Sequence, residues 1–253
     1  MALPRRLVVL ASASALVVGL AGCASKGSTE AVELTVENFA QTIAAAQSQI
    51  DPVSCTFELS VTALGTTMSS TGAMRATEDG VAEMSMTMDI PDVGSVDMLM
   101  VDGTVYMNMG ELTGGKWFVI DIDDPSLGLD QMPEVDPVGD AQDLQPALIS
   151  VTKVGKPEVV DGVEVQEYEV VVEPAKVGGD MKKQMDESWA QLEEQGIELP
   201  TELTYHYFLG ADGLMRRVSV EMLDGLSTEM TFADWGQPVE IEAPPADETI
   251  ALP

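Results

Sequence analysis

The feature that most restricts the fold of this sequence is an alternation of apolar and polar side chains, which begins at residue 53 and recurs through most of the chain. A period of two is typical of β-strands that bury one face, and turn signals such as Asp102-Gly103 and Asp161-Gly162 separate the segments. Tight turns between successive strands favour an antiparallel meander. We predict strands over residues 53–63, 66–76, 81–90, 95–101, 104–109, 116–122, 151–160, 163–173, 201–209, 214–223, 226–233 and 238–242.

Three segments depart from this period and predict helices. Apolar residues recur at helical spacing over 36–50, and Asp51-Pro52 ends that pattern. A short helix is expected over 141–149, and a longer one contains Met181, Met185 and Trp189 on its apolar side. Strands and helices do not alternate regularly, so the chain is predicted to be mainly β, with helices covering one face of the sheet.

Methionines are concentrated on one face of neighbouring predicted strands. Methionine is unbranched and polarizable, so a face made of it can adapt to a flexible apolar guest such as an acyl chain. A packed core beneath the helices is the alternative interpretation, in which methionine only fills gaps. The candidate cavity-lining residues are Met84, Met86, Met88, Met98, Met100, Met107, Met109, Val218, Val220, Met222, Met230 and Phe232.

The N-terminus has the layout of a secretory signal. Arg5 and Arg6 precede an apolar run over 7–20 that is short for a membrane span, and small residues follow. The segment Leu20-Ala21-Gly22-Cys23 resembles the lipobox of bacterial lipoproteins, in which the cysteine is lipidated and becomes the first residue after cleavage. We therefore predict a signal peptide over 1–22, a lipidated N-terminus and linker over 23–33, one domain over 34–245 and a tail over 246–253.

Charge restricts the partners of this domain. Without Arg5 and Arg6, ten basic residues stand against 43 acidic ones, which gives a formal charge of −33. Phosphate backbones and anionic lipid surfaces repel such a body, so no nucleic acid partner is expected and the lipid on Cys23 has to hold the protein at the membrane. Cys55 shares a face with apolar neighbours and is predicted to be an inert core thiol.

Several features together resemble the actinobacterial LppX/LprAFG lipoproteins, which are similar in fold to LolA and LolB. They are the lipobox, an N-terminal helix, the long meander, Val101-Asp102-Gly103-Thr104-Val105-Tyr106, Gly115-Lys116-Trp117-Phe118 and Asp234-Trp235-Gly236-Gln237-Pro238-Val239. The resemblance implies a half-barrel of about eleven antiparallel strands, with helices packed over its concave face. It also implies that acylated lipids or lipoglycans bind in an apolar cavity and are carried outward from the extracytoplasmic face of the bacterial plasma membrane.

Two other classes of function stay open beside the lipid carrier: a tethered, non-catalytic binding or structural module of the envelope, and an enzyme. No enzyme is expected, because His206 stands alone and no Gly-x-Ser-x-Gly elbow or His/Cys metal spacing occurs. The segment Asp121-Ile122-Asp123-Asp124 lacks the later ligands of an EF-hand and is interpreted as a solvated loop. No cofactor or metal is expected, the chain is predicted to be a monomer, and an export partner in the membrane is left open.

Overall fold

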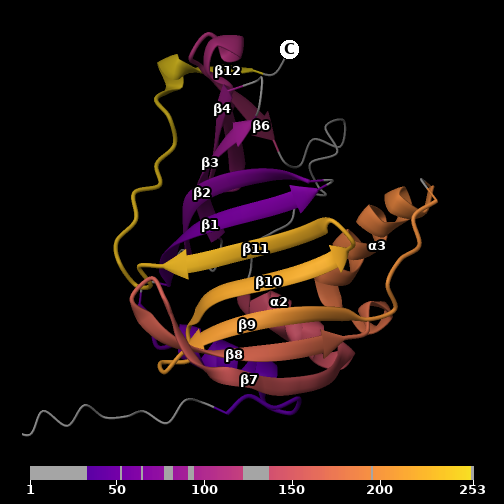
Figure 1. The fold of residues 1–253 in the computed structure, drawn as a ribbon. Coiled ribbons are helices and arrows are strands. Elements are labelled where there is room, and N and C mark those ends of the chain that lie inside the picture. Colours follow the sequence, from indigo (N-terminus) through magenta and orange to yellow (C-terminus); the bar gives the residue numbers. More distant parts are fainter. Residues whose placement is uncertain are drawn as a thin grey trace, which may run out of the picture.

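The computed structural model describes residues 33–51, 53–63, 65–76, 82–90, 94–121, 137–194 and 196–251. The predicted signal peptide, Cys23 and residues 122–136 of the acidic segment lie outside these ranges. Within them, twelve strands form one open sheet in the order β12-β6-β5-β4-β3-β2-β1-β11-β10-β9-β8-β7. The prediction of a mainly β fold is therefore confirmed (Figure 1). The strands are β1 (Ser54–Ala63), β2 (Thr66–Ala76), β3 (Ala82–Ile90), β4 (Gly94–Val101), β5 (Thr104–Asn108), β6 (Trp117–Asp121), β7 (Leu148–Val160), β8 (Val163–Val172), β9 (Leu203–Gly210), β10 (Met215–Leu223), β11 (Leu226–Ala233) and β12 (Thr249–Ala251).

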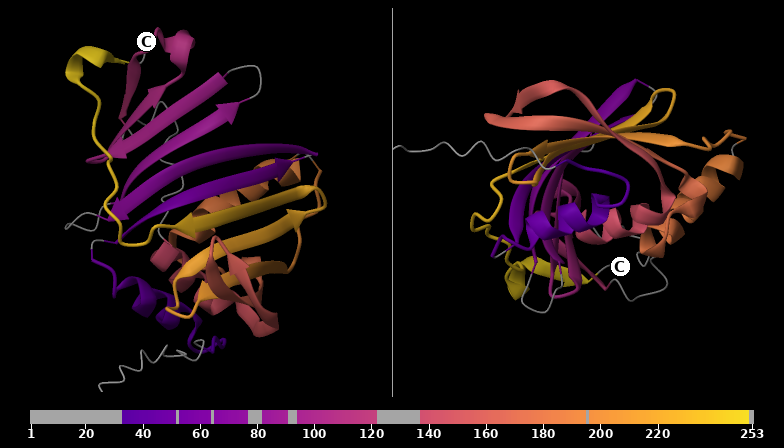
Figure 2. Two further views of the ribbon diagram at one scale, coloured as in Figure 1. Left: turned by 60° about the vertical axis from the view of Figure 1, so that its left-hand side comes forward. Right: turned by 90° about the horizontal axis from the view of Figure 1, so that it is seen from below.

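The helices lie on one side of the curved sheet, as the view from below shows (Figure 2). They are α1 (Phe39–Gln47), α2 (Pro137–Leu144) and α3 (Gly179–Glu194), with short 3-10 turns η1 (Gly110–Thr113), η3 (Gln145–Ala147), η4 (Pro174–Lys176) and η5 (Ala246–Glu248). These helices lie over β7–β11, which we call the helix-covered half, whereas β3–β6 extend beyond them (Figure 2). We call β3–β6 the methionine half; β1 and β2 join the two.

Side chains from distant segments fix the helices to one another and to the sheet. The Gln145 side chain donates to the Val36 carbonyl and accepts from the Ala40 amide, which joins η3 to the start of α1. Asp143 at the end of α2 accepts from the amide of Met181 in the first turn of α3. The Phe39 ring meets the Tyr207 ring edge-on, with 5.2 Å between their centres. The helical periodicity predicted these helices, but not which strands they cover.

The C-terminal segment corrects one predicted strand. Residues 238–242 form no strand; instead, the Arg75 guanidinium donates to the carbonyls of Val239 and Ile241. The physical reason is that Pro238 has no backbone N–H to donate and an arginine from β2 takes carbonyls that a strand partner would need. The segment 246–253, expected to be a tail, contains β12, which pairs in parallel with β6. Residues 234–248 thus form a strap from β11 to the far edge of the sheet (Figure 1).

Candidate functional site

The register of β3–β6 places the predicted methionines on one face. Met84 pairs with Met100, which pairs with Val105, and one step along the strands Met86 pairs with Met98, which pairs with Met107. Because directly opposed residues in a sheet point to the same side, these side chains form two neighbouring rungs. The rungs continue onto β6, since Val105 pairs with Ile120 and Met107 with Phe118.

The exposure of these side chains differs along the rungs. Met84 and Met98 are buried, each with 8% of its surface exposed. Met86, Met100 and Met107 are only partly buried, although they pack against the same apolar cluster. Met88 pairs with Val96 one step further along and is also partly exposed. Met109 follows the end of β5 and immediately precedes η1, so it does not belong to this ladder.

The second predicted set comes from β10 and β11 and faces the same side. Val218 pairs with Met230, which pairs with Leu59 of β1, and Phe232 pairs with Phe57. Phe232 is buried, while Val218, Val220, Met222 and Met230 are partly buried against the cluster that contains Met84 and Met98. The structure therefore brings both predicted sets to one continuous apolar face. Whether that face encloses a lipid cavity stays a prediction.

Sequence reasoning missed the aromatic part of this face. Tyr168, Tyr205 and Tyr207 belong to the same apolar cluster, and Tyr168 is 1% exposed. Burial is the main cause that raises the pKa of the Tyr168 hydroxyl, which also forms a hydrogen bond with the backbone of Leu34. The signal was present in the alternation of tyrosine with polar residues over 204–207. Met74 was also missed; it pairs with Met84 and with Cys55.

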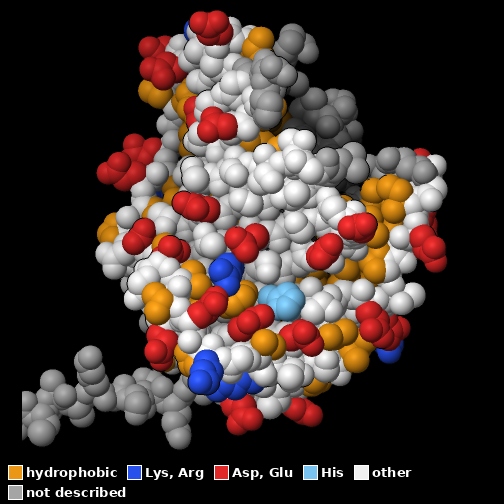
Figure 3. All heavy atoms as spheres, in the orientation of Figure 1, with side chains coloured by type: hydrophobic (Ala, Val, Ile, Leu, Met, Phe, Trp, Pro, Cys, Tyr) orange, Lys and Arg blue, Asp and Glu red, His pale blue; other side chains and the backbone are white. Residues whose placement is uncertain are grey.

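The opposite face of the sheet is polar and carries two hollows. One, of about 560 Å³, is lined by side chains that include Thr56, Thr71, Ser85 and Thr231. The other, of about 590 Å³, is lined by residues that include Glu202, His206, Ser219 and Glu229. Both lie on the side of the sheet that faces away from α1–α3. In the space-filling view this side shows mainly backbone and uncharged polar side chains, with scattered acidic ones (Figure 3).

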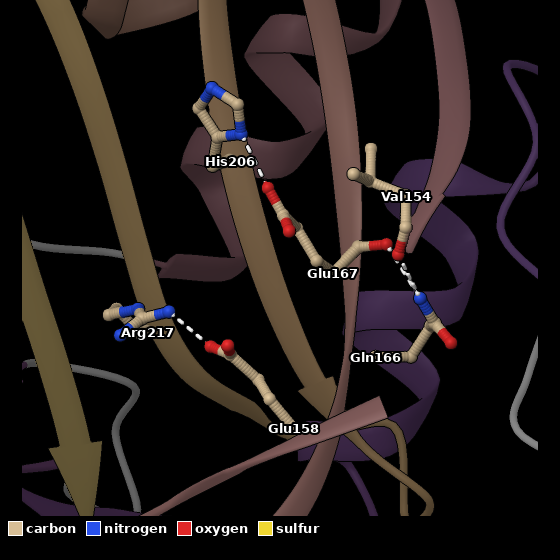
Figure 4. Close-up of polar contacts among 6 residues, drawn as sticks. All are labelled: Val154, Glu158, Gln166, Glu167, His206 and Arg217. Carbon is tan, nitrogen blue, oxygen red and sulfur yellow. Dashed lines mark hydrogen bonds and ion pairs between the residues drawn. The ribbon is translucent and has the colours of Figure 1, made fainter. Parts of the chain in front are cut away.

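His206 is part of a polar network on this outer face (Figure 4). Its Nδ1 lies 2.8 Å from Glu167 Oε1, and nearby Arg217 pairs with Glu158 at 2.5 Å. Arg217 also stacks over the Phe208 ring, with 3.7 Å from its guanidinium carbon to the ring centre. His206–Glu167 and Arg217–Phe208 join neighbouring strands, whereas Arg217–Glu158 reaches from β10 to β7. All three contacts link strands of the sheet, which is consistent with the predicted structural role of His206.

The predictions for Cys55, for metal sites and for the acidic loop can be compared with the residues that the structure describes. Cys55 is fully buried, and burial raises the pKa of its thiol from 9.0 to about 12, as expected for an inert core cysteine. Among the residues that the structure describes, no three His, Cys, Asp or Glu side chains are grouped so that they would hold a metal ion. Within the same ranges, no helix combines the length and the apolar character needed to cross a membrane. Residues 122–124 of the acidic loop lie outside the described ranges.

Comparison with solved structures identifies similar folds. LprF from Mycobacterium bovis is 15% identical, with a TM-score of 0.52 over 83% of this chain and 96% of LprF. The lipoprotein LppX from Mycobacterium tuberculosis is 13% identical, with a TM-score of 0.51 over 80% of this chain and 95% of LppX. A LolA-superfamily protein from Nitrosomonas europaea also matches, with a TM-score of only 0.29, which is too low to indicate a shared fold.

No protein-family model matches the sequence, and no curated protein matches it either. The matches to LprF and LppX confirm the resemblance to the LppX/LprAFG lipoproteins as a structural similarity at low sequence identity.

Proposed function

We propose that this chain is a lipoprotein, anchored through Cys23 at the extracytoplasmic face of the plasma membrane, which binds acylated lipids or lipoglycans and carries them across the envelope. The observation that carries the proposal is the pair of methionine rungs across β3–β5, because they supply a wide, adaptable apolar face that the helices α1–α3 do not cover. The shared fold with LppX, itself a lipoprotein, supports it.

The energetics set the requirement for such a carrier. Moving one sixteen-carbon chain from a bilayer into water costs on the order of 13 kcal/mol, at ~0.8 kcal/mol per CH₂. A carrier has to replace nearly all of that apolar contact. The proposed contact surface is the methionine half together with Val218, Val220, Met222, Met230 and Phe232 of the helix-covered half.

Cargo is tested on protein that starts at residue 24 and is purified from its native host. Native mass spectrometry and lipid extraction should find bound acyl lipid. Met86→Asp and Met98→Asp should each abolish loading, because an unpaired carboxylate beside an acyl chain is strongly disfavoured. Ser85→Asp is the matched control, since Ser85 neighbours Met86 on β3 but its side chain points to the opposite, outer face of the sheet. Protein that never carries lipid and takes none up from vesicles would contradict the carrier.

Anchoring is tested separately at the N-terminus. Mass spectrometry of the mature chain should find a lipidated Cys23 as its first residue, and Cys23→Ala should leave the protein without lipid. An unmodified Cys23, or a mature chain that begins elsewhere, would reject the anchor without affecting the test of cargo.

The outer face favours a second candidate, a tethered module that binds another envelope component without lipid cargo. Its two hollows, with their hydroxyl and carboxylate linings, offer a polar surface for such a partner. Lipid-free protein that is nevertheless anchored would support this candidate over the carrier.

A further inference from the structure

The edge strand β7 carries two basic side chains that differ from the others in the described ranges. Arg75, Lys176, Lys182, Arg216 and Arg217 each pair with a carboxylate. Lys116 donates to the Asp247 carbonyl, and Lys183 also has a partner. Among the described residues, only Lys153 and Lys156 remain without an ion pair or side-chain hydrogen bond, and both are exposed. Two unpaired lysines, three positions apart on a body with so many acidic residues, indicate a surface for an anionic partner.

The start of the described chain lies beside this strand. Lys153 pairs in register with Tyr168, and the Tyr168 hydroxyl is bonded to the backbone of Leu34. In Figure 1 the indigo start of the chain accordingly lies next to β7, the outermost strand of the helix-covered half. Nine residues, and so ten Cα-to-Cα steps, lie between Cys23 and Glu33, the first residue that the structure describes. A segment of that length spans at most about 35 Å, so an anchor on Cys23 keeps the β7 edge near the bilayer.

The same strand is irregular and partly apolar. Its pairing with β8 is interrupted between Val154 and Glu158, so Lys156 lies in the interruption. Ile149 and Val159 are 46% and 68% exposed, and they are two of the four large apolar side chains exposed in the described ranges. Exposed apolar side chains with nearby lysines suit the interface between lipid headgroups and acyl chains. Figure 3 shows basic side chains at the lower end of the molecule, where β7 lies.

We propose that the β7 edge faces the bilayer and that Lys153 and Lys156 contact anionic phospholipid headgroups. The proposal rests on the anchor proposed at Cys23. The net charge of the body repels an anionic surface, but charges further away than about 8 Å are screened at physiological salt, so the charges on the β7 edge itself decide the contact. Of the nearby acids, Glu158 is paired with Arg217 and Glu167 with His206, while Glu33, Glu164 and Glu169 lie near the β7 edge. Each lysine then gives roughly a fivefold preference for an anionic surface, so the anchor holds the protein and the lysines orient it.

This orientation has a consequence for cargo. The edge formed by β12 and β6 is at the opposite end of the sheet from β7 (Figure 1). The methionine half would then point away from the membrane that holds the anchor, toward the next layer of the envelope.

The orientation is tested on the full-length lipidated protein in vesicles. Thr152→Cys places a fluorophore on β7, and Leu112→Cys places one at the far end, where Leu112 is 68% exposed. Buried Cys55 is expected to stay unlabelled. Nitroxide-labelled headgroups in vesicles of three parts phosphatidylglycerol to seven parts phosphatidylcholine should quench the probe at 152 several-fold more than the probe at 112. The double variant Lys153→Gln, Lys156→Gln should lose most of this difference, as should vesicles of phosphatidylcholine alone.

The controls separate this proposal from its alternatives. The double variant Lys116→Gln, Lys176→Gln changes the net charge equally and should keep the difference in quenching.

Lysine on an edge strand also prevents strand pairing between molecules. If the β7 variant only aggregates more while the monomeric fraction keeps its orientation, edge protection explains the lysines and the proposal is wrong. Equal quenching at both probes on vesicle-bound protein would also overturn the proposed orientation, and would favour an acidic protein as the partner of the lysines. Failure to bind vesicles at all would overturn the proposed anchor instead.

Discussion

The two halves of the sheet bury the same face with different kinds of side chain. In the helix-covered half, Tyr168, Val170 and Val172 are at most 1% exposed. In the methionine half, Met84 and Met98 are each 8% exposed, and Met86 and Met107 are exposed further. Branched and aromatic side chains have few rotamers and fix one packing, whereas methionine has three rotatable bonds and fills irregular space. One continuous sheet thus combines a closed, rigid core with a more adaptable apolar surface.

The largest effect on stability is expected when one apolar side chain in each half is truncated to alanine and the two losses are compared. Phe39→Ala removes the ring that packs on Tyr207 and should lower the free energy of unfolding by about 3–5 kcal/mol, since it leaves a cavity in a closed core. Met86→Ala should cost about 1 kcal/mol, because its side chain is already partly exposed and less apolar contact is lost. Urea unfolding followed by circular dichroism measures both. Equal losses would mean that the methionine half is packed as tightly as the helix-covered half.

A smaller effect is expected at the strap that links the two halves. Arg75 holds the strap through the Val239 and Ile241 carbonyls and pairs with Glu83 Oε2 at 2.6 Å, while the Glu83 side chain is only 6% exposed. Arg75→Gln leaves that carboxylate without its cation, so the free energy of unfolding should fall by about 2–3 kcal/mol. Hydrogen exchange should accelerate in β12 and β6 before it does in β8 and β9.

The control for the strap is Lys182→Gln, which breaks an exposed pair with Asp186 one helical turn away. It should cost less than about 0.5 kcal/mol and leave exchange in β6 unchanged. Exchange that accelerates equally in all strands of the Arg75 variant would show that the strap stabilises the whole sheet and not the methionine half in particular.

The smallest effect concerns Cys55, on the strand that joins the halves. Burial raises the pKa of its thiol from 9.0 to about 12, so the folded protein keeps the proton that the unfolded chain releases. The resulting stability is fully present below pH 9 and is lost as the pH rises from about 9 to 12. At pH 10 the free energy of unfolding should be lower by about 1 kcal/mol than at pH 8, beyond the change seen in Cys55→Val. An identical pH dependence in the two proteins would show that the thiol is not protected from ionisation.

The sequence predicted most of the local structure. Strands β1–β11 all lie close to their predicted ranges, because alternation of side chains across a strand depends only on local backbone geometry. For the same reason, alternation alone places the methionines of β3 on one face of that strand, and likewise those of β4. Helix spacing likewise predicted α3, and an approximate position for α1 and α2. Met109 is the exception in the candidate site, since β5 ends one residue before it.

What the tertiary structure decided depends on contacts between distant residues. The strand predicted over 238–242 is absent because Arg75, more than 160 positions away, takes its carbonyls. The pairing of β12 with β6 and the coverage of only one half by α1–α3 follow from the path of the whole chain. The sequence by itself determined which side each side chain faces, because that is set by neighbours along the chain. Only the tertiary structure decided which faces are covered, because coverage requires segments that are far apart in sequence to meet.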